Sequence, residues 1–216
     1  MMISPEMFVE DVLKGKTREE ALKEVGSLRQ EIKDLEKAIY EDLEPEELMI
    51  CPSPQVRIDM DYDYLLAARK YFLLMGWEYA LSEEEKADED FNGKICDIKS
   101  IEFRIGGYFG GSRVRTVTFD GDKVTDSFEV FRRIKSPDEE ESDLSKFTRQ
   151  EFLDILSECH MGRWKESYMD SNILDGTSWD VVITYDNGKT WKSGGCNAYP
   201  YNFQGFLEAM EIEDEL

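Results

Sequence analysis

The spacing of the apolar residues changes near residue 95, and this change restricts the fold more than any other feature of the sequence. Before it, apolar residues recur every three or four positions, as on one face of a helix. After it, they alternate with polar residues: Ile101, Phe103 and Ile105 flank Glu102 and Arg104, which is typical of a half-buried strand. The sequence therefore predicts an α+β fold that begins with a helical region.

The residues after this change predict an antiparallel sheet. Two turn dipeptides each separate a pair of segments in which apolar and polar residues alternate, as in β-hairpins: Asp120–Gly121 and Asn187–Gly188. Between them, Thr148 and Glu151 form a capping box that starts a helix, and a last helix begins near Pro200. The predicted order is β-β-β-α-β-β-α, with roughly five mostly antiparallel strands and helices packed on one face.

Residues 1–50 form the predicted helical N-terminal region. Ser4–Pro5 starts a short helix, and the capping box Thr17–Glu20 starts a longer one that runs to about Tyr40. Its apolar positions step by four and three residues, which gives a heptad seam like that of a coiled coil: Ala21, Val25, Leu28, Ile32, Leu35 and Ile39. Either the chain's own helices cover this seam, or a second copy does, as in a homo-oligomer or an assembly protein.

A linker with three prolines, Leu43–Gln55, separates this region from a predicted α+β domain at 56–216. The domain begins with Met60–Leu81, which is apolar almost all round and predicts a central buried helix. Two acidic segments, 82–94 and 135–146, are predicted to be exposed loops.

Charge limits the partners of this chain. It holds 48 acidic and 26 basic residues, a net charge of −22. Such a surface repels nucleic acid and anionic membranes, and it attracts a basic protein. No apolar run is long enough for a transmembrane helix, and the N-terminus lacks the pattern of a signal peptide, so we expect a cytoplasmic protein.

The cysteines and the alternating acids indicate neither a metal site nor a disulfide framework. Cys51, Cys96, Cys159 and Cys196 show no paired spacing, so we expect reduced and mostly buried thiols. Asp59, Asp61 and Asp63 start like a calcium loop, but Tyr64 and Lys70 stand where an EF-hand needs glycine and glutamate. We expect no metal and no cofactor.

Gly194–Gly195–Cys196, between a strand and a helix, suits either a tight turn or a reactive thiol. We favour the tight turn, because a thiol needs a base and the chain has a single histidine, His160. The enzyme alternative places a cryptic thiol site at Cys196 and His160, together with a weak anion-binding patch formed by Arg104, Arg113 and Arg115.

The interpretation that we favour is a non-enzymatic, acidic interaction protein. It would bind, and inhibit, a basic nucleic-acid-binding protein by mimicking nucleic acid, as small acidic proteins of phages and other mobile elements do. The expected contact residues are the acidic clusters and two aromatic anchors in a glycine-rich turn: Glu83, Glu84, Glu85, Asp88, Glu89, Asp90, Glu139, Glu140, Glu141, Tyr108 and Phe109.

Overall fold

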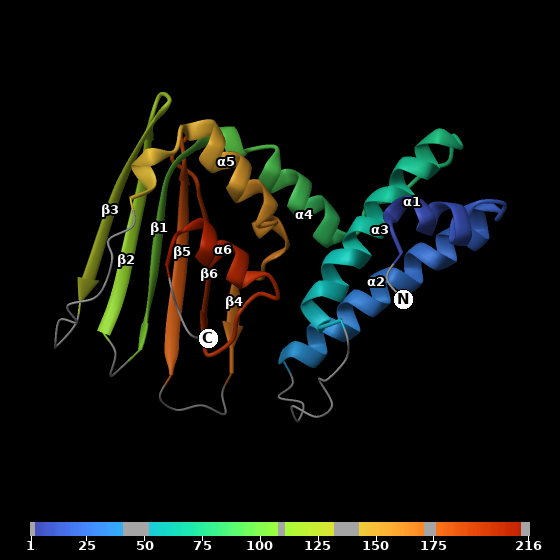
Figure 1. The fold of residues 1–216 in the computed structure, drawn as a ribbon, viewed down its shortest axis with the longest axis horizontal. Helices are drawn as coiled ribbons and strands as arrows, with labels where there is room; N and C mark the ends of the chain where they lie inside the picture. The colour runs from blue at the N-terminus through green and yellow to red at the C-terminus, as the bar shows by residue number, and fades with distance from the viewer. Residues whose placement is uncertain (1–2, 41–51, 108–110, 132–142, 171–175, 213–216) are drawn as a thin grey trace. The chain divides into compact units, whose positions relative to one another are not determined.

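The computed structural model describes residues 3–40, 52–107, 111–131, 143–170 and 176–212 (Figure 1). Helices and one mixed sheet make up these ranges, which confirms the α+β fold class. The chain divides into two compact units, residues 1–81 and 82–216. The segment 56–81 therefore belongs to the first unit, whereas the sequence placed it in the second. None of the described helices is long and apolar enough to cross a membrane.

The first unit is helical. It contains α1 (Pro5–Phe8), a π-helical stretch η1 (Val9–Leu13), α2 (Arg18–Tyr40) and α3 (Pro54–Leu74). Serines cap the first and last of these helices, because the side chains of Ser4 and Ser53 accept hydrogen bonds from amides three residues ahead. Each serine precedes a proline, which is suited to the first turn of a helix.

The heptad seam of α2 is covered within the first unit. Its residues Ala21, Val25, Leu28, Ile32 and Leu35 are buried, and α2 packs along α3. In the structure, the chain's own helices cover these positions of the seam. A second copy could reach these buried positions only if α2 and α3 first separated.

Asp61 of α3 is a buried carboxylate within this unit. Its Oδ2 atom has no hydrogen-bond partner among the described residues, and burial raises the pKa of Asp61 to about 6, although Arg57 acts in the opposite direction. In an unfolded chain the pKa is about 3.9. Between these two values the folded state binds more protons, so the free energy of unfolding falls as the pH rises.

We expect Asp61→Asn to raise the free energy of unfolding at pH 7 by about 1–2 kcal/mol, and this gain should vanish near pH 4. Urea unfolding of both proteins across this pH range measures the difference. The exposed Asp11→Asn is the control for the general repulsion in an acidic chain. A gain that is the same at every pH would contradict the assignment to Asp61.

The second unit is built on one sheet. Its strands are β1 (Ile98–Gly107), β2 (Gly111–Asp120), β3 (Lys123–Phe131), β4 (Ser167–Met169), β5 (Thr177–Tyr185) and β6 (Thr190–Cys196). Their order is β3-β2-β1-β5-β6-β4, and every pair is antiparallel except β4 and β6. The prediction of mostly antiparallel strands is confirmed, with six strands in place of roughly five.

Two α-helices cover one face of this sheet, as Figure 1 shows for α5 (Arg149–Glu158) and α6 (Phe203–Ala209). Phe152 of α5 packs on Phe119 of β2, and Phe206 of α6 packs on Phe103 of β1 at a ring-centroid distance of 5.0 Å. The alternation predicted for β1 is correct: Ile101, Phe103 and Ile105 are fully buried on this covered face.

The segment 82–94, predicted to be a loop, contains the helix α4 (Glu83–Asn92). Ser82 and Glu85 form a complete capping box, which satisfies free amides at the start of the helix. Asp88 and Phe91, three residues apart, form its buried side. Of the segment 135–146, the structure describes only the end, a 3₁₀ turn at Leu144–Lys146 called η3, while the residues before Asp143 lie outside the described ranges.

The tight turn predicted at Gly194–Cys196 is wrong, because these residues end strand β6 and pair with Ser178–Asp180 of β5. The chain turns one residue later, at Asn197, which adopts the left-handed conformation with φ = 54°. Gly195 instead permits close packing, because a Cβ atom there would lie 2.5 Å from the Ala198 carbonyl and 2.6 Å from Nε1 of Trp179.

Candidate partner-binding surface

Helix α4 presents three of the predicted acidic contact residues of the second unit to solvent. The side chains of Glu83 and Asp90 are 88% and 82% exposed, Glu89 is exposed, and Glu84 and Glu85 are half-buried. We call the exposed carboxylates Glu83, Glu89 and Asp90 the α4 acidic face. Their cationic neighbours are Lys86 on the helix, which pairs with Glu83, and Lys94 just after its end, which pairs with Asp90.

Asp88, which was predicted to contact a partner, points inward. Its Oδ2 atom lies 2.9 Å from Nδ1 of His160 and 3.0 Å from Nη2 of Arg163. The Asp88 side chain is 10% exposed, and its Oδ1 atom is buried without a hydrogen-bond partner in the described structure. The Asp88 carboxylate therefore holds α4 against His160 and Arg163, and it does not belong to the exposed surface.

Two apolar contacts fix the same side of α4. Gly162, in the 3₁₀ turn η4 (Met161–Arg163), packs directly on the helix backbone: a Cβ atom there would lie 2.5 Å from Cα of Asp88 and 2.6 Å from the Ala87 carbonyl. One turn along, Phe91 packs edge-on against Trp191 of β6. The acidic face is thus held on a helix whose opposite side is locked by polar and apolar contacts.

The chain's single histidine is engaged in this support. His160 adopts the left-handed conformation at φ = 46°, which turns the chain from α5 into η4 and aims its ring at Asp88. Arg163 continues the cluster, because its Nη1 atom donates a hydrogen bond to the Tyr201 hydroxyl. The thiol next to His160 is poorly reactive, since burial raises the pKa of Cys159 to about 12.

The residues of the enzyme alternative lie on different faces of the sheet. Cys196 and Arg104 point to the uncovered face, and Arg113 and Arg115 point to the covered one, as the pairing register requires. Cys196 is half-buried beside Asn197, while His160 faces Asp88. The structure therefore does not bring the three arginines together into one anion-binding patch.

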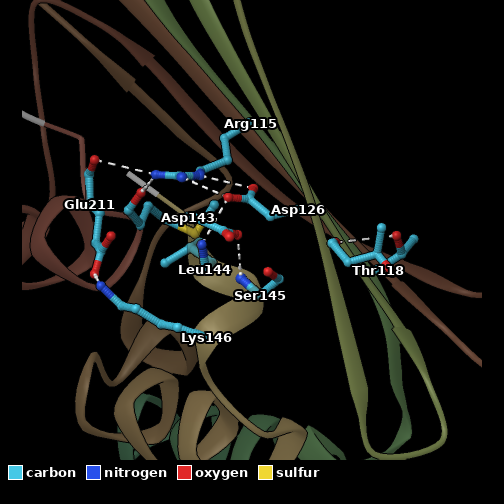
Figure 2. A network of polar contacts seen from close by, with 10 residues as sticks. Arg115, Thr118, Asp126, Asp143, Leu144, Ser145, Lys146 and Glu211 are labelled. Carbon is cyan, nitrogen blue, oxygen red and sulfur yellow. Dashed lines mark hydrogen bonds and ion pairs between the residues drawn. The ribbon is translucent and has the colours of Figure 1, made fainter. Parts of the chain in front are cut away.

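Arg115 has a structural role instead. It is fully buried, and its guanidinium donates hydrogen bonds of 3.0 and 2.7 Å to the two carboxylate oxygens of Asp126 on β3. It also donates to the carbonyls of Met210 and Glu211 just after α6 (Figure 2). Asp126 in turn accepts a hydrogen bond from the amide of Leu144. This pair, which we call the Arg115 clamp, joins β2, β3, η3 and the end of α6.

The uncovered face of the sheet is mixed in charge. Glu102 and Arg104 of β1 are both about half exposed, and they pair weakly at 3.9 Å. Burial raises the pKa of the neighbouring Asp180, while Arg104 lowers it. A depression of about 260 Å³ lies over β1, β2 and β3 and is lined by Glu102, Arg104, Glu129 and Phe131 among others. This face lacks the one-sided charge of the α4 acidic face.

The remaining predicted contact residues, Tyr108, Phe109, Glu139, Glu140 and Glu141, lie outside the described ranges, as does Cys51. Within the described ranges, no three His, Cys, Asp or Glu side chains gather as metal ligands. No sequence pattern indicates the support of α4 by His160 and Arg163, because it joins segments 72 or more residues apart. No family model, curated protein or solved structure matches this chain.

Proposed function

We propose that this chain is a non-enzymatic, acidic interaction protein that binds a basic nucleic-acid-binding protein at the surface its partner uses for nucleic acid. The observation that carries the proposal is the α4 acidic face, held rigidly in an already acidic unit. Residues 82–216 contain 30 acidic and 16 basic residues, a net charge of −14. A partner rich in lysine and arginine would be drawn to this unit from a distance.

The geometry of α4 supports mimicry of a phosphate backbone. At a rise of about 1.5 Å per residue, Glu83 and Asp90 lie about 10 Å apart along the helix axis. The acidic face thus places three carboxylates along a length over which one DNA strand places about three phosphates. Because Asp88, Gly162 and Phe91 fix the helix, its carboxylates need little ordering when a partner binds.

One lysine on α4 and one just after it weaken the negative field of the acidic face, and a partner has to displace them. Lys86 and Lys94 pair with Glu83 and Asp90 at 2.7 and 3.8 Å. Exposed pairs of this kind contribute at most about 1 kcal/mol, so arginines of a partner can displace them. Arginine is the better competitor because its planar group binds a carboxylate with two hydrogen bonds.

The test is a pull-down from a lysate of the source organism with three immobilised proteins. They are the wild type, the α4 variant E83Q/E89Q/D90N, and the control variant E10Q/D11N/E19Q, which loses three exposed acids of the first unit. We expect the wild type and the control to retain the same basic protein, and added duplex DNA or high salt to release it. The α4 variant should bind that purified protein at least about tenfold more weakly.

Equal losses in the two variants would mean that net charge alone retains the partner, and they would overturn the assignment to α4. Retention that resists both added DNA and salt would overturn the nucleic-acid-mimic proposal itself.

A further inference from the structure

The outer side of α3 carries large apolar side chains that the first unit does not bury. Leu66 is 49% exposed, Leu73 is 68% exposed and Leu74 is 86% exposed. The opposite side of the same helix packs on α1 and α2 and contains Ile58, Leu65 and Phe72 among its buried residues. A helix that is apolar all round normally buries all its sides, and contiguous exposed apolar residues mark an interaction surface.

Two opposite charges flank the centre of this outer side. Asp63, Leu66, Lys70 and Leu73 follow steps of three, four and three residues, so they lie on one face of the helix. Asp63 and Lys70 are both exposed, and within the described part of the chain neither forms a hydrogen bond or a close ion pair. Lys70 makes only a minor contribution to lowering the pKa of Glu6. The main cause of that lowering is the hydrogen bond between Glu6 and Ser4.

This pattern is complementary to itself. If two copies of α3 cross in antiparallel orientation, with the two-fold axis between Leu66 and Ala67, Asp63 of each copy faces Lys70 of the other. Leu66 then faces the small Ala67, which leaves room for it, and Leu73 faces Met60. Two-fold symmetry makes every such contact occur twice, as in most homodimers.

We propose that the outer face of α3 (Asp63, Leu66, Lys70 and Leu73) binds a second copy of this chain as an antiparallel helix pair. Charge complementarity favours a second copy as the partner of this face. Two acidic chains repel each other in general, but here Asp63 of each copy faces Lys70 of the other. A single helix face is smaller than a standard stable interface, so the dimer is weak, with a dissociation constant on the order of 100 μM.

Sedimentation equilibrium of the full chain tests this dimer. We expect the wild-type mass to rise from 25.2 kDa toward twice that value as the concentration increases through the dissociation constant. D63K and K70E should each remain monomeric, because each places like charges opposite one another. An equimolar mixture of D63K and K70E should associate again, since each aspartate or glutamate then faces a lysine.

The mixture distinguishes a lost contact from a lost fold, because misfolded variants would not restore each other. E19K and K23E make the same charge changes on the exposed side of α2, and they should dimerise like the wild type. A wild type that stays monomeric at about 1 mM, well above the expected dissociation constant, would overturn the proposal. D63K and K70E proteins that dimerise unchanged, or a mixture that stays monomeric, would also overturn it.

Discussion

Replacing Arg115 with methionine is expected to lower the free energy of unfolding of the second unit by about 3–5 kcal/mol. The substitution leaves the Asp126 carboxylate, whose side chain is 5% exposed, as an unpaired buried charge. It also removes the donor to the carbonyls of Met210 and Glu211, so the end of α6 loses its connection to β2. Urea unfolding of R115M and the wild type at pH 7 gives the difference directly.

Two further variants separate the buried pair from a general effect of losing an arginine. R104M removes an exposed arginine from the uncovered face of the same sheet, and it should cost less than about 1 kcal/mol. R115M/D126L removes both charges, and it should recover part of the loss, because well-packed apolar residues can replace a buried pair. If R115M costs no more than R104M, the Arg115 clamp does not stabilise the fold.

The second large effect is expected at Gly162. An alanine Cβ would lie 2.5 Å from Cα of Asp88 and 2.8 Å from Cβ of Phe91, so α4 has to move away from η4. We expect G162A to lower the free energy of unfolding by about 1–3 kcal/mol, as overpacking usually does. Amide hydrogen exchange should quicken in α4 more than in β1 and β5, which lie elsewhere in the unit.

The matched control is G205A, which places the same methyl group in α6. Nothing lies within 4 Å of that position, so alanine should leave stability unchanged or raise it by up to about 1 kcal/mol. G162A should also weaken binding of the retained basic partner, although it changes no charge. If G162A binds the partner as tightly as the wild type does, a fixed α4 is not required for partner binding.

The hairpins were predictable because their turns are local. The Asp-Gly turn sets the register of β2 and β3, and this register places Asp126 opposite Val117, next to Arg115 on the same face. The Arg115 clamp within this hairpin could therefore have been deduced from the sequence. Its contacts with Leu144, Met210 and Glu211 could not, because they depend on how distant segments pack.

The predictions that the structure overturns fail for physical reasons. The capping box Ser82–Glu85 has the same chemistry as the one at Thr148, but the run of acids around it favours a loop. Strand β4 has only three residues and pairs in parallel with β6, so alternation could not reveal it. The sequence predicts Asp88 as a surface acid, because nothing nearby in the sequence indicates its partners His160 and Arg163.

The proposal that this chain mimics nucleic acid is tested most directly by letting the chain compete with DNA for the partner retained in the pull-down. Fluorescence anisotropy would follow a labelled DNA duplex bound to that purified protein while the wild-type chain is added. We predict that the chain displaces the duplex completely and that E83Q/E89Q/D90N needs at least about a tenfold higher concentration. A ternary complex, in which the partner holds the duplex and the chain together, would contradict the account.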